Sequence, residues 1–171
     1  MTRSMLRRAG VVLAIAGIAL AVDQWTKMLV ERNLGPGAPR ATIPLLGDWF
    51  ALEYAQNRGA AFGLFPGASG AVATAAALVL AGVVVYALRR PPAWLLSIGA
   101  GLVVGGAVGN LIDRVRLGYV TDFIAVGAWP NFNVADAAVT VGVALLALDA
   151  LAESRHETRR ERVSEADERP T

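Results

Sequence analysis

Two long stretches without a charged residue set the strongest limit on how this chain can fold. Gly59 to Leu88 and Pro91 to Ile112 contain no Asp, Glu, Lys or Arg. A helix needs about 20 mainly apolar residues to cross a bilayer. Only 18% of the 171 residues are charged, whereas the share in an average soluble domain is about 25%. The sequence therefore predicts a membrane protein.

Four apolar segments predict an all-α fold, a bundle of four transmembrane helices in a single domain. They cover about residues 9–30, 68–88, 93–112 and 134–152. We place the membrane domain at residues 1–152 and expect residues 153–171, which carry mixed charge, to form a solvated tail. Gly101, Gly105 and Gly109 share one face of the third segment, a spacing that lets helices pack closely in lipid.

The basic residues predict the orientation of the bundle. Ten of the sixteen lie in three short segments, at the N-terminus, at Arg89-Arg90 and in the tail. Such segments are typically cytoplasmic, so residues 31–67 and 115–133 are expected to face outward. The first segment could instead be a cleaved signal peptide, because Ala19-Leu20-Ala21 resembles a cleavage site. Its helical pattern continues to Val30, however, which favours a retained helix.

The first outer segment is expected to hold a small extracytoplasmic β element. Phe50, Leu52 and Tyr54 alternate with their neighbours in the period of a strand, and Gly47-Asp48 is a turn signal. Aromatic residues such as Trp49 and Trp129 suit the membrane interface.

The composition excludes several kinds of chemistry. The chain has no cysteine, which excludes disulfides, a thiol nucleophile, zinc–thiolate sites and iron–sulfur clusters. Its single histidine, His156, lies in the charged tail, so a Ser–His–Asp triad is excluded too. We predict no metal and no cofactor. The basic residues form no stripe for nucleic acid, and that partner class is set aside.

Several polar residues occur where a membrane helix should be apolar. A charged side chain at the bilayer centre costs about 2.5–3.5 kcal/mol on insertion scales, so each needs a reason. By the predicted orientation they all lie at the outer side of the membrane, and they comprise Asp23, Lys27, Asn110, Asp113, Asp122, Asn133 and Asp136. The sequence therefore predicts a polar site at that depth.

Two features of this set have simpler explanations. Asn110–Asp113 and Asn133–Asp136 each place an amide and a carboxylate on one helix face, yet Asn133 or Asp136 could simply cap the fourth helix. Lys27 is the only lysine among sixteen basic residues. It could be needed as a compact ammonium, or be a chance survivor paired with Asp23.

Two neighbouring carboxylates can share one proton and activate water as acid and base. The candidates are Asp113, Asp122 and Asp136. The repeated motif favours Asp113 with Asp136, and Asp122, in a loop, is the natural mobile group. The residues alone do not decide the pair.

Five motifs over about residues 9–152 resemble, in order, those of the bacterial lipoprotein signal peptidase (signal peptidase II) family. They are Asp23-Gln-Trp-Thr-Lys27, Asn57-Arg-Gly-Ala-Ala-Phe62-Gly63, Gly105 to Arg114, Val120-Thr-Asp122-Phe123 and Phe132-Asn133-Val-Ala-Asp136. Thr121 departs from the motif, which more often carries a second Val there. The segment between Asp122 and Asp136 is short and is expected to narrow the outer rim of the site.

The resemblance implies an intramembrane aspartic endopeptidase with a small β cradle. It implies removal of the signal peptide of prolipoproteins just before the diacylglyceryl-cysteine. It places the catalytic dyad on Asp122 and Asp136, overruling the pair that symmetry favours. The supporting and substrate-binding residues would be Asp23, Lys27, Asn57, Gly59, Asn110, Asp113, Arg114 and Asn133.

The expected partners are the diacylglyceryl-modified prolipoprotein and membrane lipids, with the enzyme a monomer in the bacterial plasma (inner) membrane. Both termini would be cytoplasmic and the active site near the outer face. Two other classes compete. Intramembrane carboxylates also serve ion-coupled transporters, but these acids cluster at one face. An assembly subunit would explain the glycines but not the acids.

The orientation can be tested with a fusion. A reporter enzyme that works only in the cytoplasm should be active when it is fused after Thr171, and one that works only outside the cytoplasm should be inactive, because the arginine-rich segments stay inside. Mass determination of the mature chain is the control for the first helix. A mature protein that begins near Val22 would contradict the retained helix.

Overall fold

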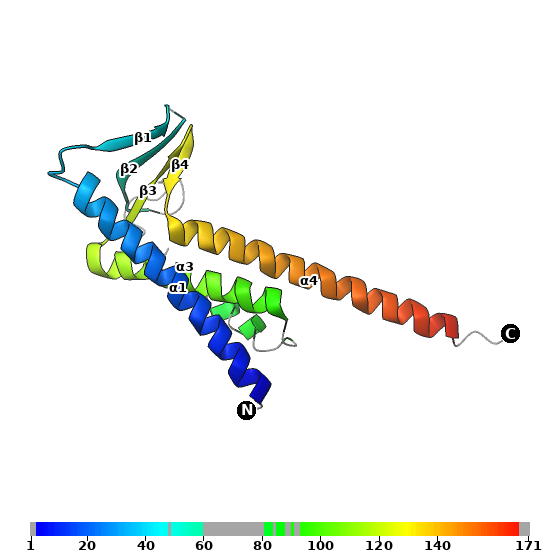
Figure 1. The fold of residues 1–171 in the computed structure, drawn as a ribbon. Helices are drawn as coiled ribbons and strands as arrows, with labels where there is room; N and C mark the ends of the chain where they lie inside the picture. The colour runs from blue at the N-terminus through cyan, green and yellow to red at the C-terminus, as the bar shows by residue number, and fades with distance from the viewer. Residues whose placement is uncertain are drawn as a thin grey trace.

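The computed structural model describes residues 3–47, 49–59, 81–83, 85–87, 90 and 93–167. Within these residues it contains three long helices and one antiparallel sheet (Figure 1). The helices are α1 (Arg3–Leu34), α3 (Trp94–Leu117) and α4 (Val134–Asp167). The strands are β1 (Thr42–Leu46), β2 (Phe50–Asn57), β3 (Val120–Val126) and β4 (Trp129–Phe132), in the order β1-β2-β3-β4.

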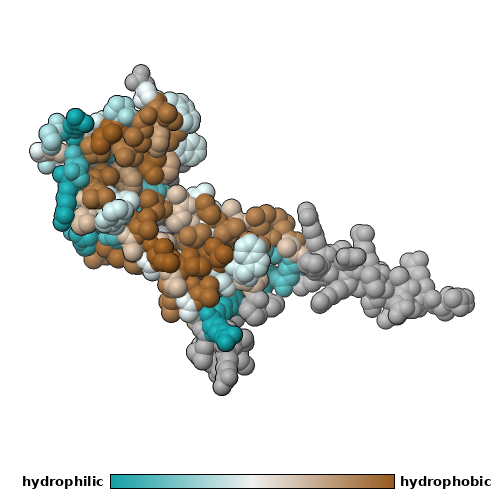
Figure 2. All heavy atoms as spheres, in the orientation of Figure 1, coloured by the Kyte–Doolittle hydropathy of each residue, from teal (hydrophilic) through white to brown (hydrophobic). Residues whose placement is uncertain are grey.

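Three described helices are long and apolar enough to cross a membrane. These spans are Arg7–Leu34, Trp94–Leu117 and Val134–Ser154, and apolar side chains cover much of their visible face (Figure 2). They match three of the four predicted segments. The remaining segment, 68–88, lies mostly outside the described residues, although 81–83 and 85–87 are helical.

Helix α3 is longer than the sequence predicts, and its extension carries site residues. It continues to Leu117 and stops at Gly118, whose φ of 78° is left-handed and whose N–H donates to the Arg114 carbonyl at 3.1 Å. This is the usual glycine stop of a helix. Asp113 and Arg114 therefore lie inside the last turns of α3.

The glycines of α3 let its backbone touch both neighbouring helices. A Cβ atom at Gly105 would lie 2.5 Å from the Ala16 carbonyl oxygen of α1. A Cβ atom at Gly106 would lie 2.5 Å from the Ala135 carbonyl oxygen of α4. The predicted role of the glycine face in close packing is confirmed, and Gly106 extends it to α4.

The sheet lies at one end of the helices, where α1 ends and α4 begins, and the first turns of α1 and the last turns of α4 point away from it (Figure 1). Val30 and Leu34 of α1 pack against Phe123 of β3 and form its buried core. The strand near residues 49–54 is confirmed as β2, but half of the sheet comes from residues 120–132. The prediction that Asp122 lies in a loop was wrong, because β3 pairs with the distant β2.

A register shift in β2 brings its end close to Asp122. Leu52 pairs with Ile124 and Ala55 pairs with Asp122, so two residues of β2 stand opposite one residue of β3. Such a bulge bends a strand and redirects its side chains. Beyond it Asn57 pairs with Val120, two residues from Asp122 on the same strand.

The close helix contacts predict which glycine tolerates a methyl group. Gly105→Ala should destabilise the protein by about 1–3 kcal/mol, because overpacking forces the backbones apart. Gly17→Ala in α1 is the control, since no atom lies within 4 Å of its Cβ position. Thermal unfolding in detergent checks both. Equal midpoints for the two variants would contradict the packing argument.

Candidate active site

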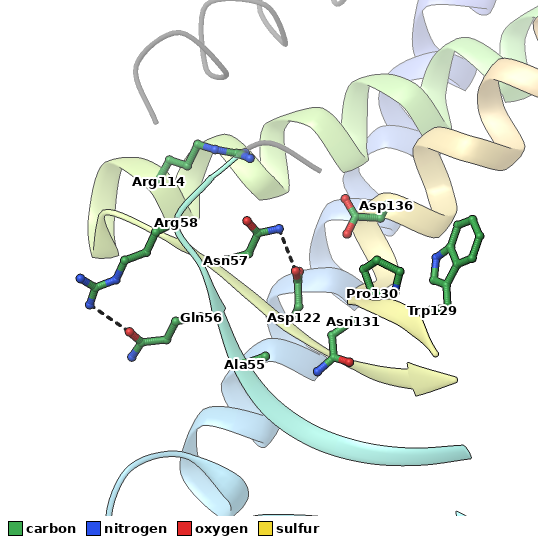
Figure 3. A pocket seen from close by; sticks show the side chains of 10 residues that line it. All are labelled: Ala55, Gln56, Asn57, Arg58, Arg114, Asp122, Trp129, Pro130, Asn131 and Asp136. Atoms are coloured by element: carbon green, nitrogen blue, oxygen red, sulfur yellow. Dashed lines mark hydrogen bonds between the residues drawn. The ribbon is translucent and has the colours of Figure 1, made fainter. Parts of the chain in front are cut away.

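A cavity of about 590 Å³ lies between the sheet and the first turn of α4 (Figure 3). Three strands and two helices contribute to its wall. Its described lining residues are Ala55, Gln56, Asn57, Arg58, Arg114, Asp122, Trp129, Pro130, Asn131 and Asp136. Two of the three candidate acids, Asp122 and Asp136, therefore face one space, and Asp113 is not among its lining residues.

Asp122 is held from two sides by amide groups. Its side chain is buried, with 2% of its surface exposed. Its two carboxylate oxygens accept hydrogen bonds from Asn57 Nδ2 at 3.0 Å and Asn133 Nδ2 at 2.7 Å. Burial raises the pKa of Asp122 from 3.8 to about 6, and the nearby charge of Asp136 adds to the rise.

Asp136 and Asn133 cap α4 and also belong to the site. Asn133 Oδ1 accepts from the Asp136 N–H at 2.9 Å, and Asp136 Oδ2 accepts from the Asn133 N–H at 3.2 Å. This reciprocal arrangement is a capping box. The capping interpretation is thus confirmed, yet the same residues also contact Asp122 and Asn110.

Two asparagine side chains link the carboxylates. Asn110 Nδ2 donates to Asp136 Oδ1 at 2.8 Å. Asn133 Nδ2 contacts Asn110 Oδ1 at 3.2 Å besides Asp122. Asn110 Oδ1 also accepts from Lys27 Nζ at 2.9 Å. Because an ammonium can only donate, the lysine fixes which end of Asn110 faces Asp136.

Lys27 is the centre of a buried ion cluster. Its ammonium lies 2.9 Å from Asp23 Oδ2 and 2.8 Å from Asp113 Oδ2. None of the three side chains exposes more than 2% of its surface. With Asn110, the three donors of the ammonium have three acceptors. The predicted ion pair between Lys27 and Asp23 is present, and Lys27 also contacts Asp113 and Asn110.

The acids of this cluster reach two further elements. Asp23 Oδ1 accepts from the Ala135 N–H at 2.9 Å, which is one of the free amides in the first turn of α4. Asp113 Oδ2 accepts from the Thr121 N–H of β3 at 3.3 Å. Lys27 and its partners therefore tie α1, α3, α4 and β3 together behind the cavity.

The remaining predicted residues flank the cavity. Gly59 donates its N–H to Asn57 Oδ1 at 3.1 Å, which orients the amide that holds Asp122. Arg114 lines the cavity and donates to the Asn110 carbonyl at 3.2 Å. Asp113, the third candidate acid, is paired with Lys27.

Two polar contacts were not predicted from the sequence. Gln24 Nε2 donates to Asp113 Oδ1 at 3.0 Å, and the Thr121 hydroxyl donates to Glu31 Oε1 at 2.7 Å. The available signal was spacing, because Glu31 follows Lys27 by four residues and shares its helix face. Among the described residues, no group of three or more acids or histidines is arranged to hold a metal ion.

Comparison with known proteins decides the family. A family model described as signal peptidase (SPase) II matches residues 15–152. The chain belongs to the signal peptidase II family. This family cleaves the signal peptides of prolipoproteins, so the resemblance seen in the motifs is confirmed and the transporter and assembly-subunit alternatives lose their support.

Relatives and solved structures agree with this assignment. The lipoprotein signal peptidase of Symbiobacterium thermophilum is 46% identical over 145 residues, covering 81% of this chain and 91% of the relative. That of Halothermothrix orenii is 40% identical over 131 residues, covering 77% and 88%. A bacterial membrane enzyme solved at 2.3 Å superposes with a TM-score of 0.75 at 27% identity, covering 85% of this chain and 90% of that one.

The ion cluster predicts a strong dependence on Lys27. Lys27→Met should destabilise the protein by about 3–5 kcal/mol, because it leaves two buried carboxylates without their cation. Arg32→Met is the control, since it removes an exposed cation from the same helix. Thermal unfolding in detergent compares them. A Lys27→Met midpoint equal to that of the control would show that the cluster is not needed for folding.

Proposed function

We propose that this signal peptidase II is an aspartic endopeptidase whose catalytic pair is Asp122 and Asp136. The observation that carries the proposal is that both carboxylates line one cavity and are linked through Asn133 and Asn110. Two carboxylates in one site favour a state in which one holds a proton and the other is ionised. Such a pair can activate water without a metal or a covalent intermediate.

The chemistry divides between the two acids. Burial raises the pKa of Asp122, which favours it as the carboxylic acid. Asp136 lies in the first turn of α4, where the helix dipole stabilises a negative charge. Asp136 takes a proton from water as the water oxygen attacks the scissile carbonyl carbon. Asp122 gives its proton to the carbonyl oxygen. Collapse of the tetrahedral intermediate breaks the C–N bond as Asp136 protonates the leaving amine and Asp122 takes back a proton from a hydroxyl group of the intermediate, which restores both acids to their starting states.

The asparagines position these groups and leave the proton transfers to the acids. Asn57 and Asn133 each donate to one oxygen of Asp122, which sets the plane of the carboxyl group. Neutral amides neither take up nor release a proton at moderate pH. Arg114 at the cavity wall supplies a positive charge near the reacting carbonyl, and we assign it to substrate binding with Asn57 and Gly59.

The membrane location fits the substrate class that the family implies. A diacylglyceryl-cysteine carries two acyl chains, which an apolar bundle can keep in lipid while the cleaved bond reaches the polar cavity. We place this cavity near the outer face of the plasma membrane, with both termini in the cytoplasm. The peptidase unit is residues 1–152, the tail 153–171 lies outside it, and the enzyme acts as a monomer.

The dyad assignment predicts the result of two conservative substitutions. Asp122→Asn and Asp136→Asn should each abolish cleavage of a lipidated prolipoprotein, since an amide keeps the shape but transfers no proton. Each acid–base group contributes about 10²–10⁴-fold, and paired groups are not additive. The double variant should therefore be little worse than either single one in a detergent-based cleavage assay.

Two controls separate catalysis from folding. Asp149→Asn removes a carboxylate further along α4 and should cleave normally. At pH values above 6, the Asp122→Asn variant should unfold at the same temperature as the wild-type protein or at a higher one. The raised pKa means that the folded state binds the proton more tightly, so ionisation of Asp122 costs folding stability between about pH 4 and pH 6. Near wild-type cleavage by a folded Asp122→Asn variant would refute the assignment.

A further inference from the structure

Three side chains spaced by four residues on α1 contact three different parts of the site. Asp23 accepts from Ala135 of α4, and Lys27 contacts Asn110 and Asp113 of α3. The next position in this series is Glu31, whose carboxylate accepts from the Thr121 hydroxyl of β3 at 2.7 Å. One face of α1 therefore contacts α3, α4 and β3, which carry both proposed catalytic residues and most of the side chains that support them.

Thr121 is bound through each of its polar groups. Its residue surface is fully buried. The hydroxyl donates to Glu31, the backbone N–H donates to Asp113, and the carbonyl accepts from Asn133 Nδ2 at 3.3 Å. The next residue in β3 is Asp122. Any movement of Thr121 would therefore move the catalytic carboxyl group.

Side chains alternate between the two faces of β3, so the hydrogen bond between Thr121 and Glu31 on one face affects the side chain of Asp122 on the other. Successive side chains of β3 point to opposite faces, so the Thr121 hydroxyl and the Asp122 carboxyl group lie on opposite sides of one backbone. A hydrogen bond to a carboxylate is short and about twice as strong as one between neutral groups. Holding Thr121 on one face consequently restricts rotation of the strand and the direction of Asp122 on the other.

Glu31 acts at a distance from the substrate. The catalytic cavity has no Glu31 among its lining residues, whereas a second cavity of about 300 Å³ is lined by Glu31 together with Gln24, Lys27 and Asp113. Glu31 is half-buried there. Its route to the reaction runs through Thr121 and β3.

We propose that Glu31 is a positioning residue of this enzyme, which sets the direction of Asp122 through the hydroxyl of Thr121. The effect of Glu31 on the cleavage rate rests on the proposed function of Asp122. The effect of Glu31 on the surroundings of Asp122, measured by the pKa of Asp122, is independent of that proposed function.

Matched variants separate the hydroxyl from the shape of the side chain. Thr121→Val keeps the branched shape and loses the donor, whereas Thr121→Ser loses a methyl group and keeps the donor. Glu31→Ala removes the acceptor, and Thr42→Val on the exposed strand β1 controls for a general effect of the substitution. Cleavage kinetics, thermal midpoints in detergent and carbon-13 titration of the Asp122 carboxyl group are measured for each, with Asp122→Asn in the same assay.

The proposal expects Thr121→Val and Glu31→Ala each to lower kcat about tenfold at unchanged KM, the size expected for loss of one hydrogen bond to a charged group. The double variant should be no slower than either single one, and Thr121→Ser should recover most of kcat. In Thr121→Val the pKa of Asp122 should fall from about 6 towards 3.8, because a freed strand admits water.

Other outcomes identify which claim fails. Wild-type kcat in both Thr121→Val and Glu31→Ala, with Asp122→Asn inactive, would overturn the role of Glu31 and leave the dyad intact. A larger loss of kcat in Thr121→Ser than in Thr121→Val would also overturn the role of Glu31. The shape of the side chain at position 121, and not its hydroxyl group, would then determine kcat. If the Asp122→Asn variant cleaves normally, Asp122 and Asp136 are not the catalytic pair. The carbon-13 titration of the Asp122 carboxyl group then tests whether Thr121 controls the surroundings of Asp122. An unchanged Asp122 midpoint in Thr121→Val then overturns the inference, and a lowered one supports it.

Discussion

The buried ammonium of Lys27 is the interaction on which the site depends most. It joins two carboxylates and one amide that come from α1 and α3, and neither carboxylate side chain exposes more than 2% of its surface. Burying charges costs several kcal/mol per ion unless each is paired and hydrogen-bonded. All three donors must therefore be matched, and this requirement fixes the rotation of α1 against α3. The orientation of Asn110, and through it of Asp136, follows from the same constraint.

Under the proposed function, the start of α4 serves folding and catalysis with the same atoms. The first turn of a helix leaves amides that need acceptors, and Asn133, Asp136 and Asp23 supply them. A capped first turn is rigid, so the Asp136 carboxylate is held before substrate arrives. Preorganised polar groups of this kind are what acid–base chemistry in a low-dielectric site requires. Asn133 and Asp136 can therefore cap the helix and take part in the proposed chemistry at the same time, so the two interpretations of these residues do not exclude each other.

The sequence predicted the parts of the site that local spacing encodes. Helical spacing led to Asn110, Asn133 and Asp136, but only the resemblance of the motifs to the family pointed to Asp122 with Asp136. The structure gathers these residues around one cavity. The strand around Asp122 was missed because it exists only through pairing with β2, which is far away in the chain. The pairing of Asp113 with Lys27 was not predicted, because a residue's place on a helix face does not say which neighbour packs against it. Glu31 was overlooked because a charged residue near a helix end usually has a solvated partner or none.

The short connection between the two proposed catalytic acids, Asp122 and Asp136, is a structural feature of its own. β3 and β4 form a hairpin in which Ile124 pairs with Phe132, so the chain returns to the level of Asp122 before α4 begins. Asn133, the next residue, then reaches Asp122 directly at 2.7 Å. Val126 also pairs with Trp129, with a register shift between the two pairs, and a register of this kind is fixed by the side-chain pattern and the turn. The hairpin tip, where Trp129 is exposed at the cavity wall, lies outside the contact that holds Asn133 against Asp122.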